Sequence, residues 1–241
     1  MKRTRYIICD YNIDEEIEQN LIKFGVTPIK LHGVDRFGED NLLNCHPDMF
    51  CFKLEENRWL FYDEVYKINK NILDKLSLEI IPIENPISCG YPFDVGLNAA
   101  KFGDYLICNV RYTNEKVIRY FYENNKNIKI INVKQGYAKC SVCIVDENSI
   151  ITSDVSIYKQ AKQNNINVLL IEPGHIDLNG YDYGFIGGCS GLIYLNKLAF
   201  TGNIDMHPNC GDIKKFCGGR GVEIVSLSEN KLYDYGSLFV V

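Results

Sequence analysis

Short runs of β-branched and other apolar residues recur along the chain at intervals of about 50 residues, a period typical of repeat proteins. Five runs resemble one another and lie at residues 28–31, 80–83, 130–133, 168–171 and 224–227. Their length and composition indicate short, largely buried strands. The pattern therefore predicts five copies of one supersecondary unit.

A helical pattern precedes each of these runs. Apolar residues recur at spacings of three and four, as Ile17 and Leu21 do in the first unit, which is typical of a half-buried helix. The spacing predicts helices over residues 13–24, 65–76, 115–122, 155–163 and 212–217. Capping residues are expected near the helix starts at Asp14, Asn69, Thr113 and Asp154.

Before each helix the pattern predicts another strand that ends in Asp or Asn, at residues 7–10, 60–63, 106–109, 151–154 and 200–203. Four of these follow one more apolar strand, at 49–54, 95–99, 142–145 and 192–195. The first unit lacks that strand, and residues 237–241 supply a candidate. A last strand that completes the first repeat would close a ring and remove exposed sheet edges.

We therefore predict a single α/β domain of five ββαβ repeats, a pseudo-symmetric β/α propeller closed by the C-terminal strand. The approximate repeats are 1–45 (plus 234–241), 46–93, 94–138, 139–187 and 188–233. An ordinary α/β sheet of β-α-β units is the alternative, because a strand followed by a helix fits both. Two strands before each helix, and the split first repeat, favour the ring.

Composition narrows the class of protein. Of 241 residues, 46% are hydrophobic, which permits a substantial core, yet no apolar run approaches the roughly 20 residues that cross a bilayer. The basic N-terminus is followed by too short an apolar run for a signal peptide, so we expect a cytoplasmic protein with no membrane partner. Ten scattered cysteines are then expected to be reduced thiols, most of them buried.

The charge of the chain indicates which kinds of partner are expected. The net charge is −5 and no basic run exceeds a few residues, so nucleic acid is not an expected partner. A mildly acidic protein suits a cationic ligand. The oligomeric state cannot be predicted from these features.

The five-fold order resembles the pentein fold, also called the guanidino-group-modifying enzyme fold, over essentially the whole chain. The sequence looks closest to a group of uncharacterised clostridial-type proteins of that fold. Members of the pentein fold include arginine and agmatine deiminases, dimethylarginine hydrolases, amidinotransferases and a non-enzymatic ribosome anti-association factor. The resemblance implies that functional side chains converge from the repeat openings onto one end of a central channel.

Two kinds of motif carry the catalytic part of this resemblance. In the deiminases a His-x-Asp motif opens a repeat directly before a strand, and His46-Pro47-Asp48 is similar. The nucleophilic cysteine opens another repeat after small residues, which Cys140 and Cys189 both resemble. The order differs in one respect. The deiminases place the His-x-Asp repeat immediately before the cysteine repeat, whereas here the repeat that opens at Asp94 lies between His46 and Cys140.

Removal of an amino group from a guanidinium needs a thiolate nucleophile, an imidazole that protonates the departing amine and then activates water, and carboxylates that hold the cation. No metal or other cofactor is required. The repeat openings contain this set of groups. The candidate catalytic residues are Cys140, His46 and Asp48, and the candidate substrate-binding residues are Asp94, Lys139 and Asp234.

Each candidate has a plainer interpretation. Asp48 and Asp94 could cap turns, and Cys140 could be a buried thiol that packs as a small hydrophobe. A rival set is Cys189 with His175 and Asp177, which form a second His-x-Asp motif, although no strand follows it directly. Cys140 and Cys143 form a C-x-x-C pair, but residues three apart in a strand face opposite sides, so no metal site is predicted.

Two functions remain open. The first is a cysteine-dependent hydrolase or deiminase of a small cationic guanidino or amidine compound. The second is a binding or assembly protein that keeps the fold without the reaction. Geometry discriminates between them, because the first requires the Cys140 thiol and the His46 ring to lie at the same end of the channel.

Overall fold

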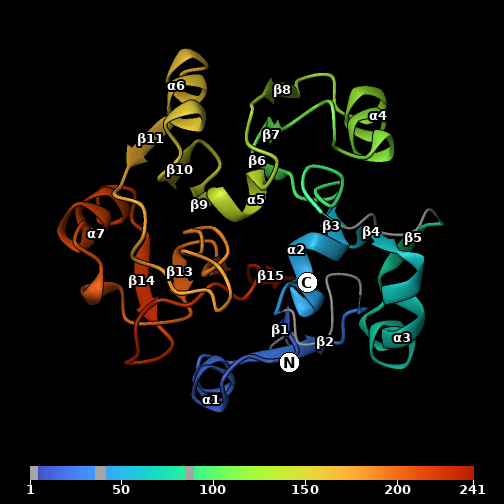
Figure 1. Cartoon of the computed structure of the whole chain (residues 1–241), viewed down its shortest axis with the longest axis horizontal. Helices are drawn as coiled ribbons and strands as arrows, with labels where there is room; N and C mark the ends of the chain where they lie inside the picture. Colours follow the sequence, from blue (N-terminus) through green and yellow to red (C-terminus); the bar gives the residue numbers. More distant parts are fainter. Residues whose placement is uncertain (1–4, 36–41, 85–89) are drawn as a thin grey trace.

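The computed structural model describes residues 5–35, 42–84 and 90–241. Five three-stranded sheets lie around a common centre, with five helices on the outside (Figure 1). The helices are α1 (Glu15–Lys23), α3 (Asp63–Leu73), α4 (Glu115–Asn124), α6 (Val155–Gln163) and α7 (Cys210–Gly218). Within these described ranges, no sheet is closed on itself.

Four sheets are built from consecutive strands, and all of them share one topology. These sheets are β3 (Cys51–Lys53), β4 (Arg58–Tyr62) and β5 (Glu79–Ile83); β6 (Ala100–Phe102), β7 (Tyr105–Cys108) and β8 (Lys129–Asn132); β9 (Cys143–Asp146), β10 (Ser149–Thr152) and β11 (Asn167–Leu170); and β12 (Ser190–Tyr194), β13 (Lys197–Phe200) and β14 (Glu223–Ser226). The first strand pairs with the central one antiparallel, and the helix crosses over to a parallel third strand.

The fifth sheet joins the two ends of the chain. Strand β1 (Arg5–Asp10) pairs in parallel with β2 (Val26–Leu31) and antiparallel with β15 (Phe239–Val240), in the register Ile8↔Phe239. The expected pairing of the C-terminal segment with the first repeat is therefore present, over a shorter strand than 237–241.

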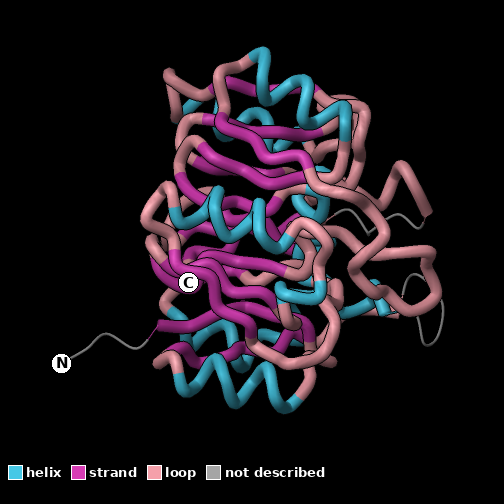
Figure 2. Tube along the Cα trace, turned by 90° about the vertical axis from the view of Figure 1, so that its left-hand side faces the viewer, coloured by secondary structure: helices cyan, strands magenta, loops and turns pink. Residues whose placement is uncertain are grey.

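Buried apolar side chains hold each helix to its sheet. In α1 the pair at spacing four, Ile17 and Leu21, is fully buried. Burial of an aliphatic side chain of this size stabilises the fold by about 1.5–3 kcal/mol. In Figure 2 the helices cover the flanks of the strands, which run across the picture. The turns within the hairpins lie at one end of the strands, and the segments that open the repeats lie at the other end.

Three local expectations are wrong, each for a physical reason. Residues 95–99 form turns rather than a strand, because Asn98 bonds to other segments and β6 begins only at Ala100. Asn69 lies inside α3 and does not cap it, because its side chain is buried and bonds both backbone groups of His32. Asn114, and not Thr113, is the N-cap of α4.

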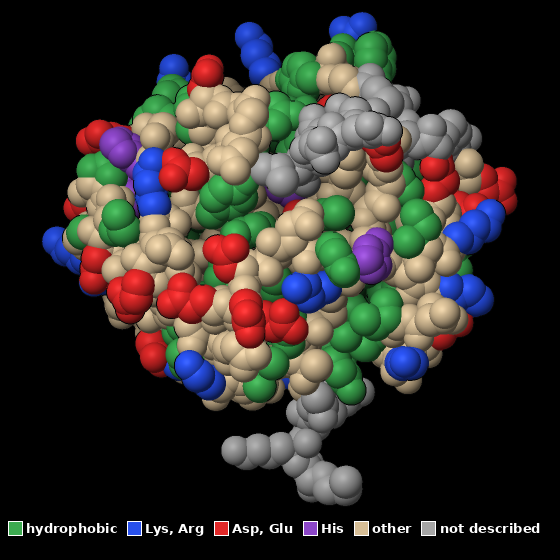
Figure 3. Space-filling view, turned by 60° about the horizontal axis from the view of Figure 1, so that its bottom comes forward, with side chains coloured by type: hydrophobic (Ala, Val, Ile, Leu, Met, Phe, Trp, Pro, Cys, Tyr) green, Lys and Arg blue, Asp and Glu red, His purple; other side chains and the backbone are tan. Residues whose placement is uncertain are grey.

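The surface of the described residues is mixed in character. On the face in Figure 3, acidic and basic side chains are interspersed, and the blue side chains drawn there form no broad patch. Within the described ranges, no helix has both the length and the apolarity needed to cross a bilayer.

Candidate active site

Two single turns of helix, which the sequence pattern did not predict, open the second and fourth repeats, and the first of them takes the place of the start of the strand predicted at residues 49–54. Helix α2 (Pro47–Phe50) has His46 as its N-cap and Pro47 at a position where a missing N–H costs nothing. Helix α5 (Ala138–Ser141) carries Cys140. Both turns lie near the centre of the molecule (Figure 1). They bring together side chains that are far apart in sequence.

Asp48 and Cys140 are in direct contact. The thiol Sγ donates to Asp48 Oδ2 at 3.1 Å, and the Ser237 hydroxyl donates to the same oxygen at 2.8 Å. Burial raises the pKa of Asp48, and burial together with the Asp48 and Asp234 charges raises the pKa of Cys140 well above its ordinary value. The cysteine of the free protein is therefore a protonated thiol at neutral pH.

Asn98 fixes the position of Cys140. Its Nδ2 donates to Cys140 Sγ at 3.0 Å, and its Oδ1 accepts from the backbone N–H groups of Lys139 and Cys140 at 2.8 and 3.2 Å. An amide donor stabilises a thiolate, so this contact opposes the rise in the pKa of Cys140. Sequence reasoning missed Asn98, because its apolar neighbours led to the prediction of a strand over residues 95–99.

His46 is buried between carboxylates. Its Nε2 lies 3.8 Å from Asp10 Oδ2 and its Nδ1 lies 3.9 Å from Asp234 Oδ1. Both distances exceed that of a hydrogen bond, and Nδ1 has no hydrogen-bond partner among the residues that the structure describes. Burial lowers the pKa of His46 to about 4, against the opposing charge of Asp48. The imidazole is neutral at neutral pH and can accept a proton.

Two of these carboxyls have raised pKa values. Burial raises the pKa of Asp10 to about 7, with a further rise from Asp234 and Asp48, and burial raises that of Asp234 to about 6. The sequence pattern predicted Asp10 only as the last residue of a strand, with no role in a site. A signal was present, because Asp10 directly follows three apolar strand residues that are fully buried.

The thiol, the imidazole and the Asp234 carboxyl face one cavity of about 260 Å³, which they share with Met49 and Leu178. Its other described lining residues include aromatic and acidic side chains, namely Tyr137, Tyr181, Tyr183, Phe185 and Asp182. Aromatic faces and carboxylates both attract cations. This cavity is suited to a small cation that is placed against Cys140.

Asp94 lies behind this cavity. Its Oδ2 accepts from the Tyr137 hydroxyl at 2.8 Å, and its buried Oδ1 has no hydrogen-bond partner. Burial raises the pKa of Asp94. Asp94 therefore supports an aromatic wall of the cavity through Tyr137.

Lys139 and Cys140 are neighbours in α5, but they line different cavities. The Lys139 ammonium donates to Ser237 Oγ at 2.9 Å and to the Gly187 carbonyl at 3.4 Å. It lines a second cavity, and it reaches Asp48 only through the Ser237 hydroxyl.

The rival residues Cys189, His175 and Asp177 are not assembled into a site. Cys189 is fully buried and donates to the Ile186 carbonyl. The half-exposed ring of His175 lies 3.8 Å from Glu172 Oε2, and Asp177 pairs with Lys231. These three described side chains make no hydrogen bond or ion pair with one another.

Gly236 is expected to be intolerant of a side chain. Its φ is +69°, and a Cβ there would lie 2.4 Å from the Cβ of His46. Gly236→Ala is expected to lower the free energy of unfolding by about 2–5 kcal/mol, from left-handed strain and overpacking together. Urea unfolding followed by circular dichroism measures this.

Gly221 offers a matched control for that substitution. It has the same φ of +69°, but its Cβ would meet nothing within 4 Å. Gly221→Ala should therefore cost only the strain, about 1–2 kcal/mol. Equal costs for the two variants would contradict the crowding that we describe around His46.

Solved structures share this fold at low sequence identity. An amidinotransferase from Microseira wollei in the saxitoxin biosynthetic pathway matches with a TM-score of 0.57 and 11% identity, over 93% of this chain and 88% of that one. Agmatine deiminase from Campylobacter jejuni gives a TM-score of 0.55 and 11% identity, over 94% and 88%. Inosamine-phosphate amidinotransferase from Streptomyces griseus gives 0.50 and 9%, over 90% and 76%.

At such identities the likeness shows the fold alone, which is that of the pentein amidinotransferases and deiminases. No curated protein matches the sequence significantly. A family model does match nearly the whole described chain, over residues 8–239. The protein accordingly belongs to the family of unknown function DUF6873.

Proposed function

We propose that the protein is a cysteine-dependent hydrolase of a small guanidino or amidine cation. One observation carries the proposal: Cys140, His46 and Asp234 face a single cavity, with Asp48 bonded to the thiol behind them. The similar solved structures are named as amidinotransferases and as an agmatine deiminase, which supports the same class of substrate. The resemblance to the clostridial-type pentein group stays part of this proposal.

Charge in the cavity explains how a protonated thiol can act. Asp10, Asp48 and Asp234 bring three carboxyls around His46 and Cys140 in a buried space. An entering cation is attracted to them and in turn favours their ionised forms and the thiolate. Substrate binding would therefore activate the nucleophile, while the free enzyme stays unreactive.

The reaction then proceeds in two balanced halves. The proton on Cys140 Sγ passes to Asp48, and the thiolate adds to the amidine carbon. That proton next moves to the departing nitrogen, which leaves as ammonia, and a cationic S-alkylthiouronium remains on Cys140. Neutral His46 then takes a proton from water, and the resulting hydroxide adds to the same carbon. Collapse releases a urea or amide and restores the thiol, and His46 passes its proton to solvent.

Labelling with 2-chloroacetamidine tests the proposal against its neutral analogue 2-chloroacetamide. We expect the cationic reagent to alkylate Cys140 at least about 10-fold faster than the neutral one, because the carboxyls concentrate a cation. Asp234→Asn should reduce this preference. Mass spectrometry of peptides identifies the cysteine, and the less buried Cys210 supplies an internal reference that should show no such preference.

One observation favours the non-catalytic function. Cys140 is buried and its proton is already bonded to Asp48, so the thiol is inert unless a ligand changes its surroundings. A pure binding protein would bind amidines reversibly without covalent capture. Slow, uniform labelling of all cysteines would therefore favour that function, and selective labelling of Cys189 would shift the site to His175 and Asp177.

A further inference from the structure

The structure contains a second and larger cavity, of about 940 Å³, that the proposed reaction does not use. Its lining includes the hairpin turns of the second, third and fourth repeats, among them Glu56, Gly103 and Glu147. The proposed catalytic side chains stand before β3 and β9, whereas these turns follow those strands. The two cavities therefore lie at opposite ends of the strands. Figure 2 shows these strands from the side.

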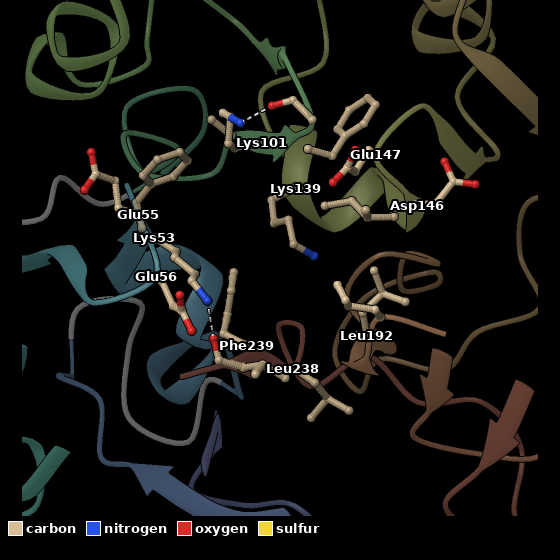
Figure 4. A pocket seen from close by; sticks show the side chains of 18 of the residues that line it. Lys53, Glu55, Glu56, Lys101, Lys139, Asp146, Glu147, Leu192, Leu238 and Phe239 are labelled. Carbon is tan, nitrogen blue, oxygen red and sulfur yellow. Dashed lines mark hydrogen bonds between the residues drawn. The ribbon is translucent and has the colours of Figure 1, made fainter. Parts of the chain in front are cut away.

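Lys139 is the buried polar group of this cavity. Its side chain points into the open space between the surrounding segments (Figure 4). The residue is only 8% exposed, and the ammonium has two oxygen partners, Ser237 Oγ and the Gly187 carbonyl. Among the residues that the structure describes, no carboxylate forms an ion pair with it. A buried ammonium that forms no direct ion pair attracts an anion.

The walls around Lys139 are apolar. Its ammonium lies 5.3 Å from the centre of the Phe239 ring, and Leu238, Leu192 and Ile144 also line the space. An apolar wall binds the hydrocarbon part of a ligand, while one buried charge fixes its orientation. A ligand that fits has one anionic end and an apolar body.

The mouth of the cavity carries charged side chains of both signs, Lys53 and Lys101 among them, and its carboxylates outnumber its ammonium groups. Glu55, Glu56 and Glu147 are exposed on facing hairpin turns, at the periphery of the pocket in Figure 4. These carboxylates disfavour a second negative charge at the outer end of a ligand. The charge pattern therefore favours a monocarboxylate over a dicarboxylate and over a cation.

We propose that this second cavity binds a small monocarboxylate with an aliphatic or aromatic body, whose carboxylate pairs with Lys139. The site is distinct from the cavity of Cys140 and goes beyond the proposed hydrolase function. The two are connected by side chains, since Lys139 donates to Ser237 Oγ, and Asp48 Oδ2 accepts from both Ser237 Oγ and Cys140 Sγ. A carboxylate on Lys139 would therefore affect the reactivity of Cys140.

The direction of that effect follows from charge. Burial raises the pKa of Asp48, and the nearby Lys139 charge works against this rise. A bound carboxylate offsets the Lys139 charge, so Asp48 and the Cys140 thiol hold their protons more firmly. Occupation of the second cavity should therefore slow reactions of the Cys140 thiolate.

Trp59 provides a direct readout of binding, because it is the single tryptophan of the chain and its ring lies 6.0 Å from that of Phe239. We would titrate the protein with hexanoate, adipate, hexanamide and hexylamine, and follow tryptophan fluorescence. Hexanoate should give a saturable change, with an affinity at least 10-fold above that of the other three. Equal affinities, or tighter binding of hexylamine, would overturn the proposal.

Two lysine variants test the anchor. Lys139→Met should weaken hexanoate binding at least 10-fold. Lys101→Met, at the same cavity, should weaken it less than 3-fold, because Lys101 is more exposed than Lys139 and solvent screens its charge more strongly. Circular dichroism checks that both variants are folded. Equal losses in the two variants would show a general charge effect and would overturn the role of Lys139.

The connection between the cavities is tested on Cys140. Saturating hexanoate should slow its alkylation by iodoacetamide at least 3-fold in the wild-type protein. Ser237→Ala removes the bridging hydroxyl, so hexanoate should still bind but should slow the alkylation less than it does in the wild-type protein. Undiminished slowing in Ser237→Ala would overturn the connection through Ser237. These readouts need no substrate turnover, so failure of the hydrolase proposal remains distinguishable.

Discussion

Replacement of Cys140 by alanine is expected to abolish hydrolysis of amidine and guanidino substrates, with kcat reduced at least about 10³-fold. The thiolate is the group that would form the covalent bond, and among the described residues no other thiol lines the cavity with His46. Release of ammonia from a panel of small amidines and guanidines, measured by a coupled assay, gives the rate. The panel should favour small cations, because the cavity is about 260 Å³.

Cys189→Ala is the matched control, since Cys189 is also a fully buried thiol. It should change kcat by less than about 3-fold, because its thiol bonds to the Ile186 carbonyl away from the cavity. Loss of activity in Cys189→Ala with retention in Cys140→Ala would reverse our assignment. Absence of turnover by the wild type, together with non-selective labelling, would favour the binding function.

Asp10→Asn is expected to stabilise the protein at alkaline pH. The folded state raises the pKa of Asp10 from 3.8 to about 7, mainly through burial, so the folded protein holds a proton that the unfolded chain has lost. The stability contributed by Asp10 is therefore complete below about pH 4 and falls as the pH rises through 7. At about 1.4 kcal/mol per pKa unit, ionised Asp10 destabilises the fold by about 4 kcal/mol at pH 8.

The variant removes this pH-dependent penalty. Asn is nearly isosteric with a protonated Asp, and its oxygen can still accept from the Asn12 N–H, which now lies 2.6 Å from Asp10 Oδ1. The two proteins should therefore have similar urea midpoints near pH 4.5, and the variant should be the more stable at pH 8. Asp234 and His46 also titrate, but they are present in both proteins, so the difference between the curves isolates Asp10.

Asp104→Asn serves as the control, because Asp104 is exposed in the turn between β6 and β7. Its free energy of unfolding should match that of the wild type within about 0.5 kcal/mol at both pH values. If Asp10→Asn were destabilising at pH 8, Asp10 would be a structural residue. A stabilising effect accompanied by weaker cation binding would mark it as part of the site.

The periodic part of the fold could be predicted from the sequence. Helix α6 has the predicted bounds, 155–163, because its apolar residues, such as Ile157 and Ala161, recur at helical spacing and its N-cap Asp154 bonds the backbone as expected. The pattern reports which side chains are buried within one unit. It was sufficient for the order of strands and helices within the repeats.

The contacts between units could not be predicted in this way. Ser237 and Asn98 both bind the Asp48–Cys140 pair, but each is a short polar residue in an apolar segment and carries no signal of its own. Likewise, adjacent positions in α5 send Lys139 and Cys140 to different cavities, which depends on a helical turn that the sequence pattern did not predict. Such outcomes are decided by packing between repeats rather than within them.

The pairing of β1 with β15 has a consequence for biosynthesis. Ile8 leaves the ribosome well before its partner Phe239, which follows it by about 230 residues of chain. The first sheet therefore keeps an open edge until β15 has been made, and pairing over so long a stretch of chain is slow. Asp234 and Ser237 lie just before β15, so a nascent chain that has not yet reached this segment has neither a complete sheet nor a complete set of carboxyls around the thiol.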